Sequence, residues 1–177
     1  MSAPVKKKPD GYHSVTPSLV IRNAAEALDF YKKAFDAKEV YRLGTPEGKI
    51  VHGEIQIGDS RVMVSDEFPE WESFAPQSIG GTPATLLIYV DDVDAAYRQA
   101  LEAGASKMSE PADQFWGDRM AGLYDPYGHR WSLATHIENV SPEEISRRAG
   151  KFFGADIKDL CAGTRGKNNG EKASAGG

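Results

Sequence analysis

The chain has 177 residues, a formal net charge of -5 and a hydrophobic fraction of 40%, which suits one globular domain or two small modules that share a core. The acidic balance excludes a nucleic-acid-binding surface of the usual kind, because that binding needs Lys and Arg to neutralise phosphates. The longest apolar run, residues 84–90, has the length of a strand, so we expect no membrane contact.

The two ends of the chain carry few large apolar residues, and we expect residues 1–12 and 155–177 to be disordered tails. The basic cluster at residues 6–8 belongs to the first tail and is expected to be solvated. No apolar stretch typical of a secretion signal follows the first residues, and the single Cys161 cannot form an internal disulfide. Both features predict a cytoplasmic protein.

The part between the tails contains an internal repeat. Residues 16–37 can be laid on residues 82–103 without a gap, and each copy has an apolar strand, a polar cap and an amphipathic helix. Asn23 is the predicted cap of the first helix, and Asp91 or Asp92 that of the second. The aligned identities are Thr16 with Thr82, Pro17 with Pro83, Tyr31 with Tyr97, Ala34 with Ala100 and Ala37 with Ala103.

Further strands are predicted after each helix, so that the unit β-α-β-β-β occurs twice. The fold class is therefore α+β, with two βαβββ modules that form a curved mixed sheet around a shared cleft, and with a C-terminal helix. We place these parts at residues 13–68 (module 1), 69–81 (linker), 82–136 (module 2) and 141–152 (C-terminal helix).

Strand alternation sorts the side chains between the helix and the cleft. In residues 50–57 the even positions His52, Glu54 and Gln56 are expected to face the cleft, and Val51, Ile55 and Ile57 the helix. The other residues expected to face the cleft are Thr16, Ser18, Met63, Ser65, Thr85, Leu87, Tyr89, Ser132 and Ala134. Those expected to face the helices are Leu19, Ile21, Val62, Val64, Leu86, Ile88, Trp131 and Leu133.

Paired modules of this kind that end in Asp125-Pro126-Tyr127-Gly128-His129 resemble the vicinal-oxygen-chelate (VOC) superfamily of glyoxalases, bleomycin-resistance proteins and dioxygenases. The segments FYKKAF, EIQIGDSRVMVSDE and DQFWGDRMAGLYDPYGHRWSLATHIENVSPEEI resemble its PhnB-like branch, and the resemblance covers about residues 13–150. It implies a dimer of two-module chains. In the metal enzymes of the family it also implies one divalent ion, held by His, Glu and Gln from the first and last strand of each module.

This sequence departs from the family's ligand pattern. The first-strand positions hold Thr16 and Thr85, and the last-strand positions hold Met63 and Ser132. Hydroxyls and a thioether are poor ligands for an ion that prefers imidazole or carboxylate. We therefore predict no cofactor at this place, and a divalent metal held elsewhere remains an alternative.

His52 and Glu54 are the candidate catalytic residues, because positions i and i+2 of a strand share one face. They suit an acid/base pair or half of a relocated metal site. The alternative is a polar pair in a pocket wall without a chemical role.

The candidate ligand-binding residues are Gln56, Tyr89, Trp116, Arg119 and Tyr124. Trp116 would supply an apolar wall and Arg119 a fixed charge for a polar or anionic ligand. In the alternative interpretation Trp116 packs in the core, and Arg119 pairs with Asp118, Asp125 or Glu54.

Together these features predict a small-molecule-binding protein of the VOC type, a homodimer without nucleic-acid or membrane partners. It would sequester a small polar or aromatic ligand or act on it. Two alternatives are a metal-dependent lyase, isomerase or dioxygenase that uses His52 and Glu54, and a non-enzymatic dimeric module.

Overall fold

The computed structural model describes residues 5–154, so the predicted C-terminal tail and Cys161 lie outside the described residues. Two compact units divide these residues. The first unit comprises residues 5–112 and 119–135, and the second comprises residues 113–118 and 136–154. Each unit is described by itself.

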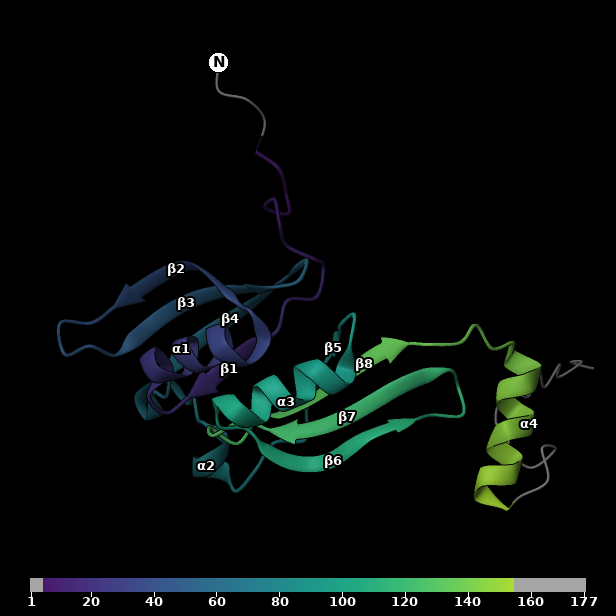
Figure 1. The fold of residues 1–177 in the computed structure, drawn as a ribbon. Helices are drawn as coiled ribbons and strands as arrows, with labels where there is room; N and C mark the ends of the chain where they lie inside the picture. Colours follow the sequence, from purple (N-terminus) through teal and green to yellow (C-terminus); the bar gives the residue numbers. More distant parts are fainter. Residues whose placement is uncertain (1–4, 155–177) are drawn as a thin grey trace, which may run out of the picture. The chain divides into compact units, whose positions relative to one another are not determined.

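The first unit contains the two predicted β-α-β-β-β modules (Figure 1). Module 1 consists of β1 (Ser18–Ile21), α1 (Ala24–Phe35), β2 (Lys38–Gly44), β3 (Ile50–Ile57) and β4 (Ser60–Asp66). Module 2 consists of β5 (Thr85–Tyr89), α3 (Val93–Ala103), β6 (Ser106–Asp113), β7 (Asp118–Tyr124) and β8 (Arg130–His136). The sheet orders are β1-β4-β3-β2 and β5-β8-β7-β6, and the first strand of each module runs parallel to the last. The predicted α+β class is thus confirmed.

Two short helices, η1 (Pro69–Trp71) and α2 (Pro76–Ile79), lie in the connection between the modules. The predicted C-terminal helix is α4 (Pro142–Phe153), which belongs to the second unit. Its N-cap is Ser141, whose side chain accepts a hydrogen bond from the backbone of Glu144. No helix within residues 5–154 combines the length and the apolar character needed to cross a membrane.

The helices of the two modules begin in different ways. Asn23 occupies the N-cap position of α1 as predicted, but it has φ 63° and its side chain makes no capping hydrogen bond. Asp66 of β4 replaces it and accepts from the backbone N–H of Ala24 at 3.0 Å. In module 2 the cap is Asp92, which accepts from Ala95 N. Asn tolerates the left-handed conformation, which turns its side chain away from the helix end.

The structure shifts the register of the repeat by three residues relative to the gapless alignment. That alignment pairs Ala24 with Val90, whereas the first residue of α3 is Val93. A shift of three residues is almost one helical turn, so the apolar face survives it. The structural register also pairs Asp66 with Thr135, whose hydroxyl accepts from Val93 N at 2.9 Å.

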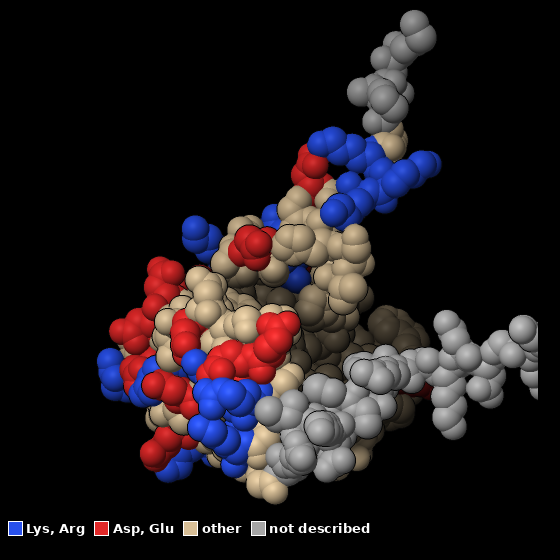
Figure 2. All heavy atoms as spheres, turned by 90° about the vertical axis from the view of Figure 1, so that its right-hand side faces the viewer, with Lys and Arg blue, Asp and Glu red and all other residues tan. Residues whose placement is uncertain are grey.

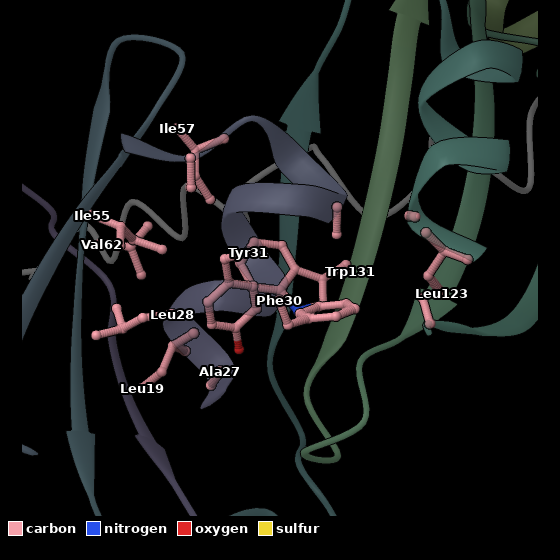
Figure 3. Close-up of a cluster of buried hydrophobic side chains, with 14 of the residues drawn as sticks. Leu19, Ala27, Leu28, Phe30, Tyr31, Ile55, Ile57, Val62, Leu123 and Trp131 are labelled. Carbon is pink, nitrogen blue, oxygen red and sulfur yellow. The ribbon is translucent and has the colours of Figure 1, made fainter. Parts of the chain in front are cut away.

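The buried core joins the two modules through their helices. Helices α1 and α3 contact each other, and Gln99 of α3 donates a hydrogen bond to the carbonyl of Lys33 in α1. Figure 3 shows Phe30 and Tyr31 of α1 directed toward Trp131 of β8, which is fully buried. The rings of Tyr31 and Trp131 lie 5.4 Å apart.

One buried carboxylate, that of Asp125, ties this core together. Its Oδ2 accepts from the Tyr31 hydroxyl at 2.7 Å and from Trp131 Nε1 at 2.9 Å. Its Oδ1 accepts from the backbone N–H groups of Tyr127 and His129. Burial and the Asp125 charge raise the pKa of Tyr31 well above its usual value, so the phenol stays a donor.

Most predicted side-chain directions agree with the observed burial. Ile55 and Ile57 are buried as predicted, but Val51 is half-buried and Ile50 is buried instead. The pairing of β2 with β3 is irregular beside Gly44, and this irregularity changes the alternation at the start of β3. Ala134, predicted to face the cleft, is fully buried because its short side chain lies on a central strand.

Candidate functional site

The polar cluster predicted on β3 lies on the face of its sheet that α1 does not cover. A Cβ on Gly53 would lie 3.6 Å from Leu28 of α1, so odd positions of β3 point to the helix. His52, Glu54 and Gln56 therefore point to the other side. Met63 of β4 is the register partner of Glu54. We call this surface, formed by His52, Glu54, Gln56 and Met63, the open face of module 1.

His52 and Glu54 form a hydrogen-bonded pair, with Nε2 and Oε1 2.9 Å apart. The Glu54 side chain is 15% exposed and that of His52 is 36% exposed. Hydrogen bonds from the Tyr12 hydroxyl and then from His52 lower the pKa of Glu54, and the nearby Arg61 charge also contributes. Ionised Glu54 can only accept, so His52 donates from Nε2 and its neutral form keeps the lone pair on Nδ1.

The N-terminal segment of residues 7–16 lies against this open face, although the sequence led us to treat most of it as a tail. Tyr12 reaches Glu54, and a Cβ on Gly11 would lie 3.3 Å from Arg61 Nε. Between this segment and Met63 lies a pocket of about 510 Å³. Its lining residues are Lys7, Lys8, Pro9, Tyr12, His13, Ser14, Thr16 and Met63.

Tyr12 and Arg61 are therefore members of the site that the sequence analysis did not propose. The turn before Arg61 matches the turn before Arg130 in the repeat, and this equivalence was the one available signal for Arg61. Nothing in the local pattern around Tyr12 connects it with β3, because the contact depends on the path of the whole N-terminal segment.

Three of the predicted ligand-binding residues lie on the strands of the first unit. Gln56 donates from Nε2 to the carbonyl of Gly58 at 3.0 Å, which closes the β3–β4 turn. Tyr89 at the end of β5 is 61% exposed, and Tyr124 at the end of β7 is 38% exposed. The ring of Tyr41 on β2 lies 6.1 Å from that of His52 and adds an aromatic surface beside the pair.

Trp116 and Arg119 belong to different units. Trp116, in the second unit, donates from Nε1 to Asp118 at 3.2 Å and packs edge-on against Phe115. Arg119, in the first unit, forms a two-point ion pair with Asp94 of α3, with distances of 2.6 and 2.9 Å.

The ion pair with Asp94 was not among the partners considered for Arg119. Arg119 shares one face of β7 with the buried Ala121 and Leu123. This is the side of the sheet that faces α3. Its charge is already used by Asp94, so a ligand would have to compete with that carboxylate.

The donor groups at the family's metal positions do not fit a divalent ion. Thr16 and Met63 line the pocket of module 1, and Thr85 and Ser132 occupy the corresponding strands of module 2. Within residues 5–154 no group of three His, Cys, Asp or Glu side chains could hold a metal ion. Hydroxyls and one thioether do not supply the imidazole or carboxylate that such an ion requires.

Comparisons with known proteins agree with this fold. An uncharacterised protein of Mycobacterium bovis is 44% identical over 135 residues, which are 75% of this chain and 89% of the relative. A protein of Mycobacterium tuberculosis has the same identity, over 79% of its length.

Three solved structures share the fold of the chain. The Arabidopsis thaliana structure is 26% identical with a TM-score of 0.57, over 69% of this chain and 98% of that one. TioX from Micromonospora is 23% identical with a TM-score of 0.55, over 69% and 97%. A PhnB protein from Bacillus cereus is 19% identical with a TM-score of 0.53, over 70% and 99%.

The family model that matches covers residues 12–133, which includes module 1 and module 2 up to the middle of β8. The match confirms the resemblance that the repeated module and its Asp125-Pro126-Tyr127-Gly128-His129 turn indicated. The chain belongs to the Glyoxalase/Bleomycin resistance protein/Dioxygenase superfamily.

Proposed function

We propose that the protein binds a small polar or aromatic molecule on the open face of module 1, without a metal at the family's usual place. Membership of the superfamily supports small-molecule binding. The observation that carries the proposal is the His52–Glu54 pair beside the pocket under the N-terminal segment. A concave site with a few convergent polar groups is what a ligand of this kind requires.

The pair is suited to move or hold a proton on the ligand. Glu54 fixes the imidazole of His52 with its Nε2 proton bound, and Nδ1 then has a lone pair that can accept a proton. The charge of Glu54 would stabilise the imidazolium that forms. If the ligand has no acidic proton, the same groups bind it by hydrogen bonds, and the protein sequesters it.

The homodimer expected from the sequence belongs to this proposal. Leu87 and Tyr89 of β5 and Tyr41 and Leu43 of β2 are each about half exposed or more in the single chain. They lie on the two different sheets of the chain, and exposed apolar side chains that form a contiguous patch are typical of an interface. A second copy would cover them.

A ligand screen tests the proposal. We expect small polar and aromatic compounds to give binding signals in ligand-observed NMR, and we expect His52→Ala and Glu54→Gln to weaken the best ligand about tenfold, the loss of one charge-assisted hydrogen bond. Glu110→Gln is the matched control, because Glu110 is an exposed carboxylate on β6. Ligands that bind equally to all variants would refute the choice of site.

Metal analysis of the same samples separates the proposal from metal-dependent catalysis. We expect no stoichiometric divalent metal in the purified protein. Metal that is present in the wild type and lost in His52→Ala would overturn the metal-free assignment.

A further inference from the structure

Arg61 has buried donors that no group within residues 5–154 satisfies. Its Nε and Nη1 atoms are inaccessible to solvent, and neither has a hydrogen-bond partner among the residues that the structure describes. A buried charged donor without an acceptor is costly, and more so than a neutral one. Its position at the start of β4 puts the guanidinium two residues before Met63, on the same side of the strand.

The N-terminal segment produces this burial. Gly11 lies directly against the guanidinium, because a Cβ at this residue would be 3.3 Å from Arg61 Nε and 3.4 Å from Nη2. The segment is fastened on both sides of Gly11. Tyr12 donates to Glu54, and His13 Nδ1 lies 3.3 Å from the Ser60 hydroxyl.

The surroundings of Arg61 are basic as well. Lys7, Lys8 and His13 line the adjoining pocket, while Lys6 is paired with Asp10 at 2.8 Å. Figure 2 shows Lys and Arg side chains grouped at the top of the view. Glu54, whose pKa the Arg61 charge helps to lower, already accepts from Tyr12 and His52.

We propose that the ligand of the open face carries an anionic oxygen group, a carboxylate or a phosphate, and that this group accepts a hydrogen bond from the guanidinium of Arg61 beneath residues 7–16. This inference rests on the proposed function and adds the chemical class of the ligand. The free Nε and Nη1 donors point to different edges of the guanidinium, and either of them can donate a charge-assisted hydrogen bond to an oxygen of such a group. The bound anion would supply the missing acceptor and thereby favour the closed position of the N-terminal segment.

The test uses the full-length protein and three probes of nearly the same shape, benzoate, phenyl phosphate and the neutral benzamide. NMR titration measures their dissociation constants. We expect at least one anion to bind about tenfold or more tightly than benzamide, as one charge-assisted pair implies. Of the two anions, the tighter identifies the group that the site prefers.

Arg61→Gln should abolish the preference for the anion and leave the affinity for benzamide unchanged. Arg130→Gln is the matched control, because Arg130 occupies the equivalent position of module 2 and also has a buried Nε without a hydrogen-bond partner in the described part of the chain. It should keep the preference. Equal losses in the two variants would overturn the assignment to module 1.

Two further measurements keep the inference falsifiable. Trypsin should cut after Lys7 more slowly when the anion is bound, because the segment then stays closed; the bond after Lys8 precedes Pro9 and is not a trypsin site. The thermal unfolding midpoint of Arg61→Gln without ligand should equal or exceed that of the wild type, since an unpaired charge has been removed. A clear loss of stability would mean that Arg61 is satisfied within the protein, and it would overturn the inference.

The outcomes also separate the inference from the function on which it rests. If anions and benzamide bind equally, and Glu54→Gln still weakens them, the anionic class is wrong and the open face remains the binding site. If neither anion binds, the inference is wrong, and the wider ligand screen decides on the proposed function.

Discussion

In module 1 the carboxylate of Asp66 holds the first backbone N–H of α1, whereas in module 2 the hydroxyl of Thr135 does the same for α3. The two residues occupy equivalent places at the ends of β4 and β8. Each satisfies the first N–H of its helix, and α3 is capped by Asp92 as well. The comparison teaches that both modules keep an oxygen acceptor at the same position, although it is a carboxylate in one module and a hydroxyl in the other.

The open faces of the two modules differ more deeply. On this side of module 1, β3 carries His52 and the ionised Glu54, whereas the equivalent strand of module 2, β7, carries Met120, Gly122 and Tyr124 there. Folding requires each sheet to have an apolar face that packs against its helix. It does not require the opposite faces of the two sheets to carry similar side chains. The candidate site therefore lies where the two copies have diverged.

The largest effect on stability is expected from truncating a side chain in the core that the two modules share. Trp131→Ala should reduce the free energy of unfolding by about 3–5 kcal/mol, because a fully buried indole leaves a cavity against Tyr31 and Phe35 of the other module. Urea denaturation measures it. Trp71→Ala is the control: this Trp is 62% exposed, and its removal should change stability by about 0.5 kcal/mol or less. Equal effects would contradict the core assignment.

A smaller effect distinguishes the two helix N-termini. Asp66→Ala should cost about 2–4 kcal/mol, because it leaves two buried N–H groups without an acceptor, those of Ala24 and Ile50. Thr135→Val should cost about 1–2 kcal/mol, since it leaves the N–H of Val93 without this acceptor and removes the hydrogen bond that the hydroxyl donates to the carbonyl of Val90, while keeping the shape. Chemical denaturation of both variants gives the difference, and a larger loss for Thr135→Val would reverse the comparison.

The smallest effect concerns the titration of Glu54. The hydrogen bond from Tyr12 is the first cause of its lowered pKa, so Tyr12→Phe should raise that pKa toward the usual value of 4.5. Carbon-detected NMR of the side-chain carboxyl measures the change. Tyr41→Phe is the control, because its ring lies beside His52 and is exposed. A Glu54 pKa that is the same in both variants would refute the contact.

The sign of the associated stability follows from the lowered pKa. The folded state favours the carboxylate, so the contribution of Glu54 to stability is present above the usual pKa of 4.5. It is lost as the pH falls through the lower folded pKa. In Tyr12→Phe the difference between the pKa of Glu54 in the folded state and that in the unfolded state becomes smaller. The stability of this variant should therefore depend less on pH in this acidic range.

The sequence predicted those parts of the fold that depend on local pattern. The helix at residues 24–35 follows from apolar spacing, and the face that His52 and Glu54 share follows from strand alternation. The repeat itself predicted the two-module architecture. A register slip of three residues did no harm in the helices, because three residues span nearly a full turn.

Contacts between distant segments were beyond such reasoning. Arg119 had several acidic candidates, and the choice of Asp94 depends on how α3 lies across β7. The contact of Tyr12 with Glu54 depends on the path of the N-terminal segment. The partners of a side chain are set by tertiary packing, which a single sequence does not display.

Asp125 binds Tyr31 of one half and Trp131 of the other through a single oxygen. The residues of the two modules that meet at Asp125 consequently cannot change independently of one another. A substitution that removes the phenol or the indole takes a donor from the buried carboxylate. Loss of the carboxylate leaves both the phenol and the indole without this acceptor. The two modules can therefore diverge at this contact only by matched substitutions of the residues that share it, and they diverge more easily at other positions.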